Sequence, residues 1–243
     1  MSLRLGLALV LAASVAAVLG RPPDGRAADE CKGLQTCLPV TGPWVAIPAP
    51  TRGGPSTVVW QLRCPLPGYV VAGIDARVSD RAIDVSIRGE NGSPVSPGVT
   101  TGREVVFSAL YTGAAARATA FQPFIGCIPT SGGGGRGETA YRRPAAFAPV
   151  KALDRRVVRK RLVSGASVRA IGGCPAGTRL LGTSHAYAFS TETEPGQTLL
   201  RAVTVRRTVT GRRVVAVAAV SPTVPQTMRV DLQLHSLCSR GAR

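Results

Sequence analysis

Polar and apolar residues alternate along several short segments of this chain. Ile83, Val85 and Ile87 alternate with polar residues, and the apolar series from Met228 to Leu234 does the same. A period of two places one set of side chains on each face of a β-strand. Similar signals predict further strands at 57–62, 69–74, 105–111, 157–163, 185–190, 199–205 and 214–220.

Helical patterns are missing from the same sequence. The apolar content is rich in valine and alanine, and no long segment has the 3.6-residue period of a helix. Clusters of Gly, Pro and Ser interrupt the chain about every ten residues, a spacing typical of β-sandwiches. The sequence therefore predicts an all-β fold, and its 243 residues suffice for one or two domains.

Three short blocks occur twice, in the same order and at nearly equal spacing. The block CPLPG at 64–68 returns as CPAG at 174–177, and TGREVV at 101–106 returns as TGRRVV at 210–215. In each copy an apolar residue followed by Gln lies six residues before a cysteine. Collinear repetition indicates an internal duplication. We therefore expect two tandem antiparallel β-sandwich-like domains.

The expected organisation has four parts. Residues 1–27 form a signal peptide, 31–130 the first repeat, 131–143 a glycine-rich linker and 144–243 the second repeat. The linker prediction depends on the run SGGGGRG at 131–137. This run lacks the Gly-Lys-Ser/Thr ending of a phosphate-binding loop, and its composition is typical of a flexible connection.

The N-terminus has the pattern of a secretory signal peptide. Arg4 precedes an apolar run of 15 residues, 5–19, and small residues follow. The run is shorter than the roughly 20 residues that span a bilayer, and a retained membrane anchor is the alternative. Cleavage fits after Gly20 or after Ala27. We expect a secreted or envelope-associated protein with no transmembrane segment after signal removal.

The six cysteines fit a disulfide framework, because export leads to an oxidising compartment. The duplicated blocks give each repeat one intradomain pair and leave two cysteines near the N-terminus. The predicted pairs are Cys64–Cys127, Cys174–Cys238 and Cys31–Cys37. Metal ligation is the alternative, but the chain has no CxxC motif and only two histidines. We therefore expect neither a metal nor a cofactor.

The chain is strongly basic, with 30 Lys+Arg against 13 Asp+Glu and a net charge of +17. Only three of these basic residues are lysines, and the codon bias of a GC-rich bacterial genome explains part of the arginine excess. Residues 151–243 carry sixteen basic and four acidic residues, a net charge of 16 − 4 = +12, with one cluster at 155–161. The excess is therefore concentrated in the second repeat, where it can act electrostatically.

Four arginines of this repeat form the candidate binding site. Arg206 and Arg207 flank one side of a predicted hairpin turn at 210–211, and Arg212 and Arg213 flank the other. A hairpin would bring these charges close together, where an anion offsets their repulsion through planar, bidentate contacts. The alternative is a solvated strand pair whose arginines reflect composition alone.

Arrangements typical of catalysis are sparse. Asp231, Gln233 and His235 form a polar row on the last predicted strand, which we interpret as a solvated outer face. Ser184 and His185 are sequence neighbours, so their side chains point to opposite faces of a strand. The acidic residues of the first repeat do not single out a pair suited to glycoside hydrolysis. We expect no catalytic residues.

The leading hypothesis is a secreted, non-catalytic binding or envelope-structural protein. Its basic second repeat would contact an anionic cell-envelope component or an extracellular polymer. Nucleic acid is not expected as a partner, because the arginine clusters lack aromatic stacking platforms. The alternatives are a secreted hydrolase, using His235 or the carboxylates of the first repeat, and a carrier of small ligands in the cleft between the domains.

Overall fold

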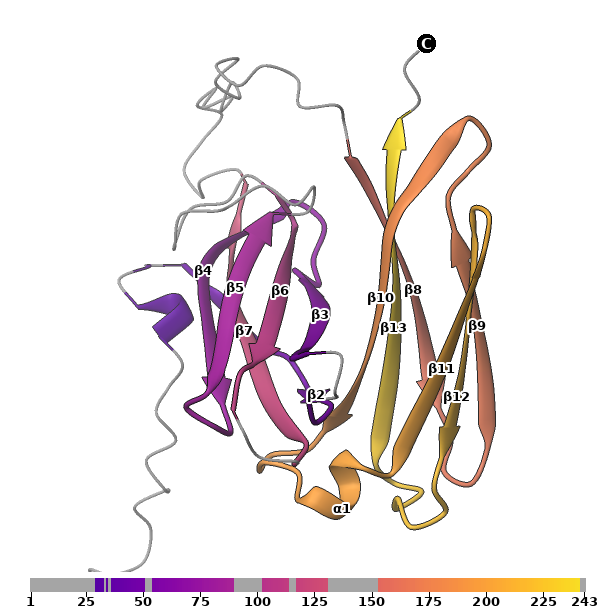
Figure 1. Ribbon diagram of the computed structural model, residues 1–243. Coiled ribbons are helices and arrows are strands. Elements are labelled where there is room, and N and C mark those ends of the chain that lie inside the picture. The colour runs from indigo at the N-terminus through magenta and orange to yellow at the C-terminus, as the bar shows by residue number, and fades with distance from the viewer. Residues whose placement is uncertain are drawn as a thin grey trace, which may run out of the picture.

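A computed structural model describes residues 29–32, 34, 36–50, 54–89, 102–113, 117–130 and 153–240. The regular secondary structure of this part of the chain is almost entirely β, in agreement with the predicted class (Figure 1). The predicted signal peptide and the predicted glycine-rich linker lie outside the described residues.

The strands fall into two halves. The first half contains η1 (Asp29–Cys31), β1 (Leu38–Thr41), β2 (Trp44–Ile47), β3 (Ser56–Arg63), β4 (Tyr69–Val78), β5 (Ile83–Gly89), β6 (Glu104–Tyr111) and β7 (Thr119–Pro129). The second half contains β8 (Leu153–Leu162), β9 (Ser167–Gly173), β10 (Thr178–Ser190), α1 (Gln197–Leu200), β11 (Val203–Thr210), β12 (Arg213–Val220) and β13 (Arg229–Arg240).

One predicted strand begins later than expected. The segment 199–205 opens in the short helix α1, and β11 starts only at Val203. Leu200 is buried at 1% exposure, and its carbonyl accepts a hydrogen bond from the Tyr187 hydroxyl at 2.6 Å. The helical turn thus places Leu200 in the core next to the start of the strand, a tertiary contact that local periodicity does not reveal.

One seven-stranded antiparallel sheet runs through both halves. β4 pairs with one edge of β7, while β1 and β2 follow each other along the other edge. β2 also pairs with β10, Val45 opposite Ala188 and Trp44 opposite Phe189, and β10 continues the sheet to β13 and β8. The sequence predicts two sandwiches in tandem, and the β2–β10 pairing joins their larger sheets into one.

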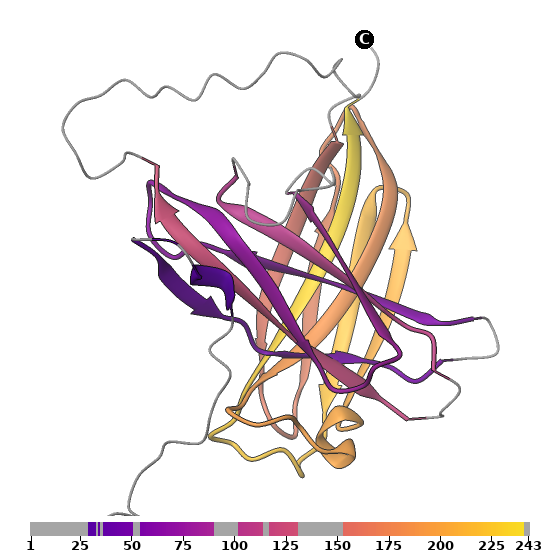
Figure 2. The same ribbon diagram turned by 90° about the vertical axis from the view of Figure 1, so that its left-hand side faces the viewer.

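Two three-stranded sheets, β3-β6-β5 and β9-β12-β11, cover this large sheet. Val45 and Ala188 contribute to the core under the first, whereas Trp44 and Phe189 contribute to the core under the second. Because successive side chains of a strand point to opposite faces, the two small sheets lie on opposite faces of the large one. The strands of the two halves cross obliquely (Figure 2).

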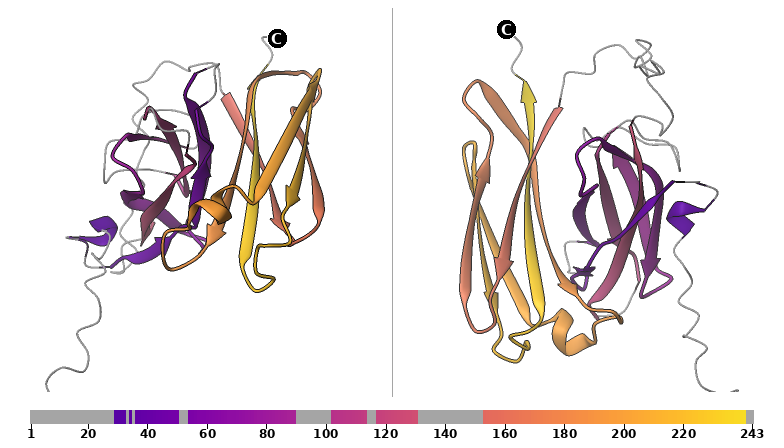
Figure 3. Two further views of the ribbon diagram at one scale, coloured as in Figure 1. Left: turned by 60° about the horizontal axis from the view of Figure 1, so that its bottom comes forward. Right: turned by 180° about the vertical axis from the view of Figure 1, so that it is seen from behind.

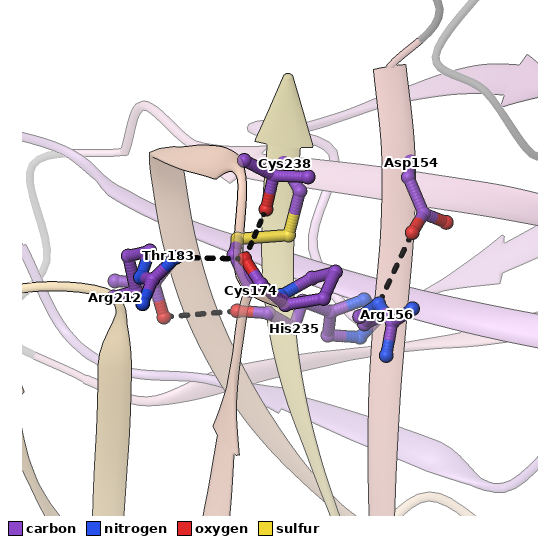
Figure 4. Close-up of a disulfide and its surroundings, with 9 residues drawn as sticks. Asp154, Arg156, Cys174, Thr183, Arg212, His235 and Cys238 are labelled. Atoms are coloured by element: carbon purple, nitrogen blue, oxygen red, sulfur yellow. Dashed lines mark hydrogen bonds and ion pairs between the residues drawn. A yellow bond between two sulfur atoms is a disulfide. The ribbon is translucent and has the colours of Figure 1, made fainter. Parts of the chain in front are cut away.

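Three disulfides fasten the described strands. They are Cys31–Cys37, Cys64–Cys127 and Cys174–Cys238, the same pairs that the sequence predicts. Each of the two long-range bridges ties the residue that follows an edge strand, β3 or β9, to the long strand β7 or β13. Figure 4 shows the bridge to β13 with its neighbours on β8 and in the turn between β11 and β12.

The first disulfide loop packs against the large sheet. A Cβ atom on Gly73 of β4 would lie 1.5 Å from the Glu30 carbonyl oxygen, and one on Gly126 of β7 would lie 2.2 Å from it. Glycine at these two positions therefore lets η1 approach the sheet backbone closely. In the second half, α1 lies beside the first half (Figure 3), and Gln197 donates to the Ala118 carbonyl at 2.6 Å.

Candidate functional site

The predicted arginine hairpin is present. β11 and β12 pair from Val203–Val220 to Thr210–Arg213, which leaves a two-residue turn at Gly211 and Arg212. Gly211 has a φ of +57°, in the left-handed region that glycine adopts without a steric penalty. The turn chemistry of the sequence therefore fits the geometry.

The four arginines of the hairpin do not form one cluster. Arg206 lies opposite Val217 on the outer face of the small sheet. Arg207 points to the inner side, where its Nη1 lies 3.5 Å from Nδ1 of His185. Arg212 donates from the turn to the Pro175 carbonyl at 3.3 Å (Figure 4). The prediction that a hairpin brings all four charges together is wrong, because neighbouring residues of a strand alternate in direction.

The outer face of β9-β12-β11 carries two of the predicted arginines and one that the sequence analysis missed. We call its twelve outward positions, four from each strand, the cationic face. They are Ser167, Arg169, Ile171, Gly173, Thr204, Arg206, Thr208, Thr210, Arg213, Val215, Val217 and Ala219. The set contains three arginines and no carboxylate. Arg169 was missed because β9 was not among the predicted strands.

Aliphatic side chains lie between the arginines of this face. Val217 separates Arg206 from Arg169 in one row across the three strands, and Ile171 lies in the next row. Val217 and Ile171 are 42% and 45% exposed. The cationic face therefore presents guanidinium groups together with exposed β-branched residues to a partner.

A second candidate site is a cleft of about 1100 Å³ between the halves. We call it the inter-half cleft. Its cationic lining residues are Arg63 and Arg77 from the first half and Arg159, Lys160, Arg161 and Arg229 from the second. Glu192 and Asp231 are the carboxylates that line it within the described residues. A carrier site between the two domains is one of the alternatives drawn from the sequence. The residues that line the cleft depend on how the halves pack, so the sequence alone does not identify them.

Several of these cations have described partners. Arg63 forms an ion pair with Glu104 at 3.2 Å, and Arg229 forms one with Asp231 at 2.6 Å. Arg159 instead donates to the side-chain carbonyl of Gln61 at 3.0 Å, and this uncharged partner does not neutralise its positive charge. Partial burial of the guanidinium lowers the pKa of Arg159, an effect that Glu104 opposes and Arg63 reinforces.

Gln61 and Gln233 line the cleft and join the two halves through hydrogen bonds. The Gln61 backbone amide donates to Oε1 of Gln233, and Nε2 of Gln233 donates to the Gln61 carbonyl, both at 2.9 Å. Each of the two side chains is only 3% exposed. The Gln233 amide thereby satisfies backbone groups at the edge of β3, as a paired strand would.

The interpretation of the Asp231, Gln233 and His235 row as a solvated outer face is wrong. Gln233 is buried and His235 is 1% exposed, because β3 of the first half packs on this face of β13. Nε2 of His235 lies 3.0 Å from Oε1 of Gln233. Burial, with smaller effects of Arg155 and Arg159, lowers the pKa of His235 to about 3. Asp231 and Gln233 of the row line the inter-half cleft, and His235 does not.

The candidate groups for hydrolysis are dispersed. His235 does not line the inter-half cleft. Burial and the adjacent Arg207 lower the pKa of His185 to about 4. In the first half, the backbone amide of Ala82 and the guanidinium of Arg117 lower the pKa of Asp80. Within the described residues, no three potential metal ligands among His, Cys, Asp and Glu gather at one point.

Two further observations concern the chain as a whole. Comparison of the sequence with protein-family models and with curated proteins finds no match. Among the helices of the described residues, none has both the length and the apolar character to cross a membrane.

Proposed function

We propose that this is a secreted, non-catalytic binding protein of the cell envelope, and that the cationic face docks on an anionic lipid surface. The carrying observation is the composition of that face: three arginines, exposed aliphatic side chains and no carboxylate among twelve outward positions. Three disulfides are compatible with an oxidising, extracytoplasmic compartment.

A lipid surface suits this face better than a linear polymer does. Arginine binds phosphate oxygens through planar, bidentate contacts, and anionic headgroups attract basic residues. Ile171 and Val217 add apolar contact at the level of the headgroups, where aliphatic side chains gain from leaving water.

Binding rather than catalysis is favoured by the environment of the two histidines. His235 is enclosed between strands, and His185 lies beside Arg207. A general base must reach the proton that it abstracts, which the enclosure of His235 prevents. The inter-half cleft supports the carrier alternative.

We also infer that the halves arose by duplication. The order β3-β6-β5 in the first corresponds to β9-β12-β11 in the second. Register shifts occur at equivalent places, between Val71 and Gly73 in β4 and between Leu180 and Gly182 in β10. The long-range disulfides span 63 and 64 residues. If the halves arose in this way, the second half acquired the cationic face after the duplication.

The lipid proposal is tested with vesicles of phosphatidylcholine, with and without phosphatidylglycerol. We expect the protein to sediment with the anionic vesicles only. Each arginine near an anionic surface contributes about 1 kcal/mol, so the double variant Arg169→Gln/Arg206→Gln should bind roughly 30-fold more weakly.

The matched control is Arg81→Gln/Arg179→Gln, which removes two exposed arginines outside the cationic face. It should keep most of the binding. Equal losses in the two double variants would show a dependence on total charge and refute docking through this face. Binding to soluble polyphosphate without binding to vesicles would assign the face to a polymer instead.

A further inference from the structure

We infer that the inter-half cleft binds a small ligand that carries at least two anionic groups, phosphate or carboxylate. The site is separate from the cationic face: it lies between the halves, and none of its lining residues belongs to that face. Its failure would therefore leave the lipid proposal standing.

The lining of the cleft carries an excess of positive charge. Six cationic and two acidic residues line the cleft, a difference of 6 − 2 = +4. Asp231 pairs with Arg229, and Glu104 outside the lining pairs with Arg63. Within the described parts of the chain, Arg159, Lys160 and Arg161 form no ion pair. Like charges collected in a concave site raise the local concentration of anions.

The guanidinium of Arg159 is held in position before any ligand binds. Its guanidinium donates to Gln61, which is buried and bonded through its backbone to Gln233. The Gln61 side-chain amide also donates to Glu104, which fixes its carbonyl oxygen toward Arg159. Because a neutral group orients this guanidinium, its positive charge stays available to attract an anionic ligand. Its fixed orientation also reduces the conformational entropy lost on binding.

The cationic residues of the cleft lie on strands of both halves, and this arrangement determines how many anionic groups the ligand needs. Arg63 and Arg77 come from β3 and β4, whereas Arg159 and Arg161 come from β8. A ligand that meets both groups needs anionic groups at two places. Five of the six cations are arginines, whose forked donors match phosphate and carboxylate oxygens. The cleft volume of about 1100 Å³ slightly exceeds the usual range for small-molecule sites, roughly 300 to 1000 Å³.

Calorimetric titration of the whole protein with pyrophosphate, citrate and inorganic phosphate at low ionic strength tests this inference. We expect saturable binding of pyrophosphate or citrate, and at least about tenfold weaker binding of inorganic phosphate, which has one anionic group. Pyrophosphate binding more tightly than citrate would identify phosphate chemistry, and the reverse order would identify carboxylate chemistry. The bound ligand should also raise the melting temperature, since it binds the folded state.

Two single variants locate the site. Arg159→Gln and Arg161→Gln should each weaken binding about tenfold or more, as expected for the loss of a charged hydrogen bond. Arg161→Gln removes no described hydrogen bond and keeps the test valid if Arg159→Gln disturbs the fold. The double variant Arg169→Gln/Arg206→Gln should bind as the wild type does. No saturable binding, equal affinity for inorganic phosphate, or unchanged affinity in the Arg161→Gln variant would overturn the inference.

Discussion

His185 and His235 are the two histidines of the chain, and each lies where a positive charge is disfavoured. Burial is the main cause in both cases, and the nearby cations are Arg207 for His185, and Arg155 and Arg159 for His235. With its proton on Nε2, the neutral imidazole of His235 donates to Oε1 of Gln233. Both imidazoles are therefore uncharged at neutral pH.

The folded protein should lose stability as the pH falls below about 6.5. The pKa of His185 is about 4 and that of His235 about 3 in the folded state, against 6.5 in the unfolded chain. Between these values only the unfolded chain takes up the protons, so acid favours unfolding. The free energy of unfolding should be lower at pH 5 than at pH 7.5 by up to about 2 kcal/mol for each histidine.

Urea unfolding at the two pH values measures this difference. The variant His235→Gln, which keeps a donor for Gln233, should show roughly half of the wild-type pH dependence. The same unfolding free energy at both pH values in the wild type would contradict the assignment of neutral, buried histidines.

At the scale of elements, the packing of η1 on the large sheet depends on two glycines. The Gly73→Ala substitution places a methyl group 1.5 Å from the Glu30 carbonyl oxygen, so η1 and its disulfide loop must move. We expect a loss of roughly 1 to 3 kcal/mol in the free energy of unfolding, typical of overpacking.

The equivalent position of the second half supplies the control. Gly182 follows the register shift of β10 as Gly73 follows that of β4, and nothing lies within 4 Å of a Cβ atom there. Gly182→Ala should leave stability nearly unchanged in the same chemical unfolding measurement. A Gly73→Ala protein as stable as the wild type would refute close packing of η1.

Local patterns predicted most of the strands, because alternation is a property of each segment alone. The duplicated cysteine blocks likewise predicted the disulfide pairs. The polar row of β13 was misread for a physical reason: Gln233 and His235 face a strand of the other half, more than a hundred residues away in sequence. Alternation identifies the side chains that share a face, but it does not identify what covers that face.

The cationic face and the inter-half cleft differ in how far local sequence patterns predict them. The sequence placed Arg206 and Arg213 in a hairpin, and both lie on the cationic face. It did not place Arg63 and Arg159 in one cleft, since their proximity depends on how β3 packs against β13 and β8. The lining of a cleft between halves is a property of the whole molecule and leaves no local signal.

At the scale of the whole molecule, the halves share their cores. Trp44 and Ala46 of the first half contribute to the core of the second, and Ala186 and Ala188 of the second contribute to the core of the first. The β2–β10 pairing adds a continuous sheet, and Gln233 bonds to both backbone groups of Gln61. Neither half can unfold without exposing apolar surface of the other.

We therefore expect the halves to unfold in one cooperative transition. Both tryptophans lie on strands of the first half, but Trp60 packs in its own core and Trp44 in the core of the second half. Fluorescence therefore reports the packing of both cores, whereas far-ultraviolet circular dichroism reports the strands. The urea midpoints from tryptophan fluorescence and from circular dichroism should coincide, as two-state unfolding requires. Separate midpoints in the wild type would show that the halves are independent.

The Gln233→Ala variant tests the origin of this cooperativity. It leaves the buried amide and carbonyl of Gln61 and the ring of His235 without their partner, at a cost of roughly 2 to 4 kcal/mol. Gln226→Ala, in the exposed turn before β13, is the matched control and should be nearly neutral. Because the lost bonds all lie between the halves or beside their interface, the two midpoints should move apart in Gln233→Ala. A variant that is destabilised but still unfolds with coincident midpoints would show that the shared cores and the β2–β10 pairing suffice to couple the halves.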